Sequence, residues 1–145
     1  MKKRQISASN VLNEAYKYGS SFSRGMAVEF PQYTMLYISG TASVDEKGDT
    51  YKPYDFDAQV ERTYLNITKL LESENATWHD VVFTTVYIKD MSDYSKFNDY
   101  RTEFFKKNNV FPFPASVCVQ SRLCRDDLLV EIEAQAVVEK KENSD

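Results

Sequence analysis

The chain has 145 residues, of which 42% are hydrophobic and 14% aromatic, and its 18 basic and 22 acidic side chains give a net charge of −4. This size is typical of one domain with a real core, and the acidic balance argues against a sequence-independent nucleic-acid binder, which usually carries a basic patch. The only basic cluster, Lys2-Lys3-Arg4, is interpreted as a solvated tail rather than a binding arm.

Several classes of chemistry are disfavoured by what the sequence lacks. It has no run of about 18 apolar residues and no secretory signal, so neither a membrane span nor export is expected. Two cysteines, Cys118 and Cys124, are too few for a disulfide scaffold, which favours a reducing, cytoplasmic setting. A single histidine, His79, disfavours a metal site, and no phosphate-binding loop is present. We therefore expect no metal and no cofactor.

The first half of the chain predicts a hairpin followed by a helix. Residues 22–29 and 34–44 read as strands, with a turn at Pro31 and Gln32. Residues 45–56 read as a loop. Residues 57–73 are predicted to be helical, with Asp55 or Asp57 as the N-cap. Four apolar side chains in that segment recur at helical spacing: Val60, Tyr64, Ile67 and Leu71.

The second half predicts a strand, a helix and two closing strands. Residues 81–90 are rich in β-branched side chains, and residues 92–108 form a helical pattern with Phe97, Arg101, Phe104 and Phe105 on or near one stripe. A proline-rich break follows, and residues 115–121 and 128–138 read as strands. The order is β-β-α-β-α-β-β, in one domain (1–145) with a core over about 20–138 and a polar tail at 139–145.

Two helices cover only one face of such a sheet, yet the 81–90 strand is apolar on both faces. Val81, Phe83 and Tyr87 alternate with Val82, Val86 and Ile88. A strand that is apolar on both faces is usually buried on both. We therefore expect a homo-oligomer in which the second sheet face packs against another subunit.

The closing strands are predicted to carry polar side chains toward that second face. In 128–138 the even positions are apolar and belong under the helices, whereas Glu131, Glu133 and Gln135 point the other way. In 115–120 the set Ser116, Cys118 and Gln120 is assigned to the same side as these glutamates. One interpretation is a strand face in water; the other is a cleft between subunits, where a carboxylate requires a cation, hydrogen-bond donors or a catalytic role.

Several segments in the right order resemble the RidA (YjgF) family. They are "YISGTASVDEKGD", "AQVERTYLNITKLLE", "WHDVVFTTVYIKDMSDYSKFNDYRTEFF", "FPASVCV" and "LLVEIEAQAV", and the likeness runs from about residue 20 to 138. The resemblance implies a chorismate-mutase-like α+β fold, a mixed sheet with two helices on one face, and a homotrimer with ligand clefts between subunits. Members of the best-known branch hydrolyse reactive enamines and imines to 2-keto acids and ammonia without a cofactor.

The resemblance also implies site residues, position by position. Glu131 matches a glutamate that holds or activates the attacking water, and Ser39 matches a serine of the pocket. Asn98 and Cys118 match residues that line the site. Phe22 stands where the deaminase branch usually has a tyrosine.

The main departure is at Ser116, which stands where the family motif has an arginine that binds the substrate carboxylate in bidentate fashion. Arg24, Arg122 and Arg125 are candidates to replace that cation, and Arg24 is favoured because it lies within a strand near Ser39. The pattern is also similar to a branch that includes domains of chorismatase-type proteins, which points to a different anionic ligand.

Three functions follow from these observations. The first is a divergent, cofactor-free enamine/imine deaminase. The alternative is a non-catalytic trimer that binds or senses a small anionic metabolite. The third, weaker alternative is an endoribonuclease, which the acidic balance disfavours because RNA binding normally requires a positively charged groove.

Overall fold

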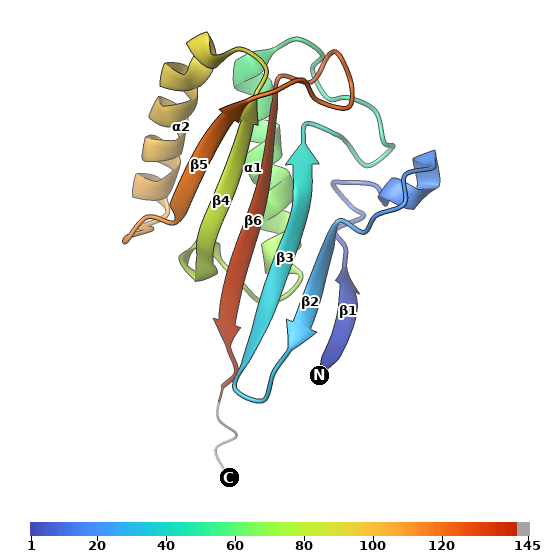
Figure 1. Ribbon diagram of the computed structural model, residues 1–145, viewed down its shortest axis with the longest axis vertical. Coiled ribbons are helices and arrows are strands. Elements are labelled where there is room, and N and C mark those ends of the chain that lie inside the picture. The colour runs from blue at the N-terminus through green and yellow to red at the C-terminus, as the bar shows by residue number, and fades with distance from the viewer. Residues whose placement is uncertain (142–145) are drawn as a thin grey trace.

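A six-stranded mixed sheet with two helices on one face forms the fold of this protein (Figure 1). The computed structural model describes residues 1–141. The strands are β1 (Lys2–Ile6), β2 (Gly25–Glu29), β3 (Tyr33–Ala42), β4 (Val81–Ile88), β5 (Ala115–Gln120) and β6 (Val130–Glu139). The helices are α1 (Phe56–Glu72) and α2 (Tyr94–Lys107), and three short 3-10 turns are η1 (Ala15–Tyr18), η2 (Trp78–Asp80) and η3 (Met91–Asp93).

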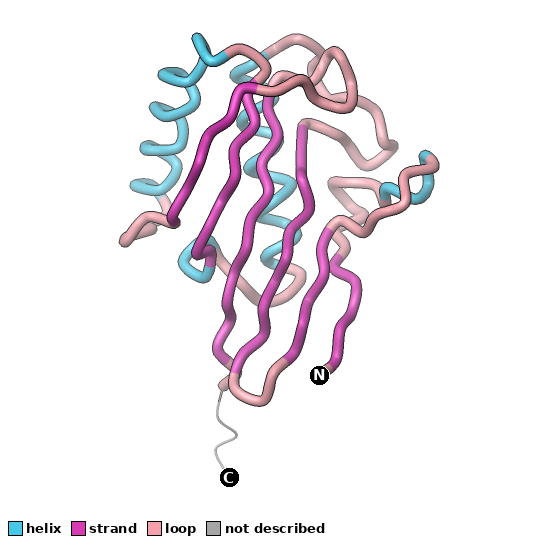
Figure 2. The backbone as a smooth tube through the Cα atoms, viewed as in Figure 1, coloured by secondary structure: helices cyan, strands magenta, loops and turns pink. Residues whose placement is uncertain are grey.

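The strands are ordered β1-β2-β3-β6-β4-β5, so the C-terminal strand lies in the middle of the sheet (Figure 2). All neighbouring pairs are antiparallel except β4 and β5, which are parallel and are joined through α2. The predicted α+β class and the order of elements from β2 to β6 are confirmed. In the predicted polar tail (139–145), Glu139 is the last residue of β6. Residues 142–145 lie outside the described residues.

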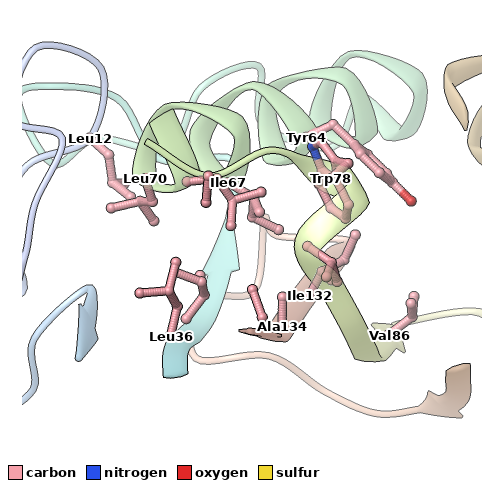
Figure 3. Close-up of a cluster of buried hydrophobic side chains, with 14 of the residues drawn as sticks. Leu12, Leu36, Tyr64, Ile67, Leu70, Trp78, Val86, Ile132 and Ala134 are labelled. Atoms are coloured by element: carbon pink, nitrogen blue, oxygen red, sulfur yellow. The ribbon is translucent and has the colours of Figure 1, made fainter. Parts of the chain in front are cut away.

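Helix α1 forms where the sequence predicts it. The Asp55 carboxylate accepts a hydrogen bond from the backbone N–H of Ala58 at 3.1 Å, so Asp55 rather than Asp57 is the N-cap. The four predicted apolar side chains are buried against the sheet. Figure 3 shows this core, in which Tyr64, Ile67 and Leu70 of α1 face β3, β4 and β6.

One strand and part of the core were not predicted. The cluster Lys2-Lys3-Arg4, interpreted above as a solvated tail, is part of β1 on the edge of the sheet, paired with β2. Arg4 forms ion pairs with Glu29 and Glu74, so its charge is compensated by carboxylates of the same fold. Ile6 and Leu12 are buried in the core, which therefore begins well before residue 20. Short strands of charged residues at a sheet edge give a weak sequence signal.

The assignment of β5 by face was wrong. Ser116 pairs with Thr84 and Cys118 pairs with Val86, and both partners are buried under the helices. Ser116 and Cys118 therefore belong to the helix-covered face, and Val117 and Val119 lie on the open face instead. Gln120, paired with the buried Ile88, follows the same pattern, so all five assigned side chains of this strand occupy the opposite face of the sheet from the one predicted.

The pattern of β4 also differs from the prediction, because a β-bulge separates Val81 from Phe83. An extra residue at a bulge changes which face the following side chains occupy. Val81 is buried, whereas Phe83 and Tyr87 lie on the open face, and Val86 and Ile88 lie under the helices. The open face is still partly apolar, as the expected oligomer requires.

Candidate functional site

Glu131 lies on the open face of the sheet, beside an irregularity in β3. The register between β3 and β6 shifts between Ile38 and Thr41, and Gly40 lies within this irregularity. A Cβ atom added to Gly40 would lie 2.9 Å from Oε2 of Glu131. The carboxylate thus rests directly against the backbone of β3, at a position where only glycine leaves room for it.

The charge of Glu131 is poorly compensated. Burial raises the pKa of its carboxyl group, the neighbouring Glu133 raises it further, and the more distant Arg24 lowers it. Glu133 itself accepts a hydrogen bond from the Tyr87 hydroxyl at 3.0 Å. Within residues 1–141, no side-chain hydrogen bond or ion pair involves Glu131. Its oxygens therefore remain available to a water molecule or a ligand.

A cavity of about 320 Å³ opens on the same face. Ser39 lines it, together with Phe22, Phe83, Glu133 and Gln135. The Ser39 hydroxyl donates to the carbonyl oxygen of Ser23 at 2.6 Å, so its proton is already used and its lone pairs remain to accept a bond from a ligand. Phe22 offers an apolar wall rather than a hydroxyl group.

Arg24, the cation favoured by the sequence, is held inside the fold. Its side chain is 2% exposed. The guanidinium donates to the backbone oxygen of Asn13 at 2.8 Å, to Oδ1 of the same residue at 3.2 Å and to the Tyr18 hydroxyl at 2.8 Å. Burial lowers its pKa. Arg24 thus makes no ion pair with Glu131, and three of its five N–H donors are already used within the fold.

The other two candidate cations are placed apart from Glu131. Arg125 donates to Thr50 Oγ1 at 3.2 Å and lies over the ring of Tyr18, with its Cζ atom 5.2 Å from the ring centroid. Arg122 is exposed, and its guanidinium makes no hydrogen bond within the described part of the chain. Neither residue lines the cavity beside Ser39.

The remaining predicted site residues gather on the helix-covered face, at the edge strand β5. Ser116 and Asn98 line a second cavity of about 220 Å³ between α2 and β5. Cys118 lies nearby on β5, with its Sγ atom 4.0 Å from Sδ of Met91, and burial raises the pKa of its thiol. A cysteine with a raised pKa is a poor nucleophile.

This second cavity contains a cation that the sequence did not single out as functional. Nη1 of Arg101 donates to the Ser116 hydroxyl at 3.3 Å, and Nη2 donates to Asn98 Oδ1 at 2.9 Å and to the Tyr94 hydroxyl at 3.1 Å. Arg101 was predicted to lie on the helix stripe with the aromatic residues. Its spacing of three from Asn98, which places both on one helix face, was the available signal.

The predicted site is therefore divided between two faces of one sheet. Glu131 and Ser39 lie toward the open face and Arg24 is held inside the fold, whereas Ser116, Cys118 and Asn98 lie with Arg101 on the other side. No group of three or more potential metal-binding side chains occurs in residues 1–141. None of the helices described is long and apolar enough to cross a membrane.

Comparison with known proteins places the whole arrangement in context. The family model described as Endoribonuclease L-PSP matches residues 14–138. A RutC family protein of Pyrococcus horikoshii is 35% identical over 104 residues, which cover 72% of this chain and 79% of that protein.

Solved structures show the same fold. The YjgF gene product of E. coli superposes with a TM-score of 0.76 at 30% identity, over 92% of this chain and 98% of that chain. A protein of the conserved Rid family, YyfA from Yersinia pestis, superposes with a TM-score of 0.79 at 27% identity, over 94% of this chain and all of the other.

Proposed function

Because this chain belongs to the RidA (YjgF) family, we propose that it is a cofactor-free hydrolase of small enamines and imines. The site is completed between the subunits of a homotrimer, and the products are a carbonyl compound and ammonia. The observation that carries the proposal is the Glu131 carboxylate, which is half-buried, has a raised pKa and makes no hydrogen bond to the described part of the chain. A carboxylate in this state suits a general base.

The chemistry requires only water and one proton acceptor. Glu131 takes a proton from water as the hydroxyl oxygen bonds to the imine carbon, and the nitrogen receives a proton as the C=N π bond breaks. In the resulting carbinolamine the hydroxyl proton is transferred to the nitrogen, the electron pair of the O–H bond forms the C=O bond, and the C–N bond breaks to release ammonia. An enamine first takes a proton at carbon to become the imine. Each step conserves atoms and electrons, and no oxidant or reductant is needed.

The division of the site between two faces supports the assembly. Within one chain the sheet separates Glu131 from Ser116 and Asn98, so one molecule of substrate contacts both groups only if they come from different subunits. The open face has partly apolar strands, and neither α1 nor α2 lies over it (Figure 1). The free thiols of Cys118 and Cys124 fit a reducing, cytoplasmic setting.

The direct test is hydrolysis of imines generated in solution from several amino acids, aliphatic and aromatic, by an amino-acid oxidase. Wild-type protein is expected to accelerate keto-acid release, and Glu131→Gln is expected to lower that rate by about 100-fold or more, because general base catalysis typically contributes roughly 10²–10⁴-fold. Failure of the wild type to accelerate any of these reactions above buffer would contradict the proposal.

A second candidate is a trimer that binds a small anionic metabolite without turnover. It is supported by Ser116, because loss of the family's carboxylate-binding arginine from that position weakens the case for catalysis on ordinary 2-imino acids. Saturable binding of a carboxylate to a protein that hydrolyses no imine would favour it. Ribonuclease activity has less support, because the basic N-terminal segment is a sheet strand whose Arg4 is already paired.

A further inference from the structure

We propose that Arg101 on α2 supplies the cation that binds the ligand's carboxylate, in the cavity between α2 and β5. The inference rests on the proposed function only for the nature of the substrate, because anion binding at this cavity is measured without turnover. The ligand class is a 2-imino or 2-keto acid with an apolar side chain. The Arg101 guanidinium, on α2, binds the carboxylate in place of the family's arginine on β5, where this chain has Ser116.

The hydrogen bonds of Arg101 leave it free to bind an anion. All three acceptors that hold the guanidinium are neutral oxygens, from Ser116, Asn98 and Tyr94. Arginine has five N–H donors, so two remain unused by these bonds. No ion pair involving Arg101 occurs within the described residues, so its charge is uncompensated there.

The guanidinium is also held in place before any ligand arrives. Its Cζ atom lies 5.0 Å from the ring centroid of the fully buried Phe97, and the Asn98 side chain, one turn away, binds Nη2. Stacking on an aromatic ring and a fixed hydrogen bond reduce the entropy lost on binding. Arg24 is less suitable, because its donors point into the fold.

Ser116 contributes a donor of its own. The Thr84 hydroxyl donates to Ser116 Oγ at 3.0 Å, and Arg101 donates to the same oxygen at 3.3 Å. A serine oxygen that accepts two hydrogen bonds still has its own proton to donate. The short side chain therefore adds a hydroxyl donor beside the guanidinium, where the family's arginine would have filled the space.

The remaining walls of the cavity indicate the rest of the ligand. Phe105, Phe113 and Pro114 line it beside the polar group, so a carboxylate at Arg101 places an attached carbon chain or ring against apolar surface. A cavity of about 220 Å³ is large enough for a benzoate-sized molecule rather than a nucleotide. This combination of one cation and aromatic walls favours the acids of larger apolar amino acids.

The first experiment measures binding of benzoate and of benzamide, its neutral counterpart, by calorimetry and by NMR of the arginine Nε–H signals. Benzoate is expected to shift the Arg101 signal and to bind well above benzamide. Arg101→Gln is expected to weaken benzoate binding by roughly ten- to a hundredfold. Lys96→Gln removes the same charge from an exposed position of α2 and is expected to have no effect. Absence of benzoate binding, or a shift at Arg24 instead, overturns the inference.

The second experiment exchanges the two positions. Ser116→Arg in the Arg101→Gln background restores a cation on β5 and is expected to recover benzoate binding to within about tenfold of wild type. If binding stays lost in the double variant while its circular dichroism remains native, a single cation does not govern this cavity and the inference fails.

The failure of this inference and that of the proposed function are distinguishable. Benzoate binding that depends on Arg101, in a protein that hydrolyses no imine, supports the anion site and removes the catalytic proposal. Conversely, hydrolysis that depends on Glu131 but is unchanged in kcat and KM by Arg101→Gln supports the catalytic proposal and removes the anion site.

Discussion

Glu131 and Glu133 are two residues apart on one strand face, yet their surroundings give them different properties. Glu133 accepts a hydrogen bond from the Tyr87 hydroxyl, whereas Glu131 lies against Gly40 and receives no side-chain hydrogen bond from the described part of the chain. One carboxylate is thus held by the fold and the other is left to bind water. This difference between neighbours is the reason why the proposed proton acceptor is Glu131, with Glu133 in a supporting role.

The raised pKa of Glu131 predicts a pH-dependent cost in stability. A carboxyl group with a raised pKa in the fold favours the protonated form there, so the folded state loses stability as pH rises from the unfolded pKa, about 4.3, through the higher folded pKa. Glu131→Gln is therefore expected to have a larger free energy of unfolding than wild type at pH 7. The difference should vanish below about pH 4 in urea denaturation.

A matched control for this prediction is Glu139→Gln, which removes a charge from an exposed position at the end of the same strand. Its free energy of unfolding should follow that of wild type across the same range. Equal stabilisation by both variants would mean that the net charge of −4, rather than the burial of Glu131, is responsible.

Gly40 is expected to control the position of the Glu131 carboxylate. In Gly40→Ala the new methyl group would lie 2.9 Å from Oε2 of Glu131, so the carboxylate must move while the backbone stays in place. Displacing a catalytic group by about 1 Å commonly costs up to a hundredfold in rate. We expect imine hydrolysis to fall by about tenfold or more while the melting temperature changes little.

The double variant separates this effect from general damage. If Gly40 acts through Glu131, Gly40→Ala should have no further effect on the rate in a Glu131→Ala background. Additive losses in the double variant would show that Gly40→Ala disturbs the site in some other way.

At the scale of single elements, the sequence predicts where β2 to β6 lie in the chain better than it predicts which of their side chains face the helices. Alternation gives β5 a period of two residues, but it does not say which set of side chains faces the helices. On pattern alone, Val117 and Val119 of β5 are expected to face the helices, because they are apolar. Pairing with β4 decides the matter, and no local pattern contains that register. For β6 the buried set is wholly apolar, and the prediction is confirmed.

The candidate site could be predicted only in part for the same reason. The resemblance placed Glu131, Ser39 and Asn98 by motif, and the sequence showed that a cation was missing at Ser116. Which arginine lies near Ser116 depends on how α2 packs against β5, and the sequence pattern of either element alone does not contain that packing. Proximity within a strand favoured Arg24, whereas the fold brings Arg101 within hydrogen-bonding distance.

The link between α1 and the end of β3 is expected to be essential for the fold. The side-chain amide nitrogen (Nδ2) of Asn66, a fully buried residue, donates to the backbone oxygens of Ala42 and Val44, each at 2.9 Å. Asn66→Ala leaves two buried carbonyl groups without these donors, which costs roughly 2–4 kcal/mol in the free energy of unfolding. Urea denaturation measures the loss. Asn10→Ala, at an exposed position, should change stability by less than about 0.5 kcal/mol.

At the scale of the whole molecule, no helix within residues 1–141 covers the open sheet face. Val117 and Val119 are 46% and 42% exposed there, and Tyr37 lies on the same face of the sheet. Both helices pack against the other face (Figure 1). Isolated exposed apolar residues are ordinary, but several on one sheet face beside a cavity indicate an interaction surface. The proposed trimer covers this surface.

The proposed trimer predicts that Val119→Lys dissociates the protein. A lysine on the open face would have to bury its charge against another subunit, which costs several kcal/mol per interface. We expect the molar mass from light scattering to fall from that of a trimer to that of a monomer of 16.8 kDa, with loss of hydrolysis because the two halves of the site separate. Leu65→Lys is the control, since Leu65 is 39% exposed on α1, away from the open face. A Val119→Lys protein that keeps the mass of the wild type would place the interface elsewhere.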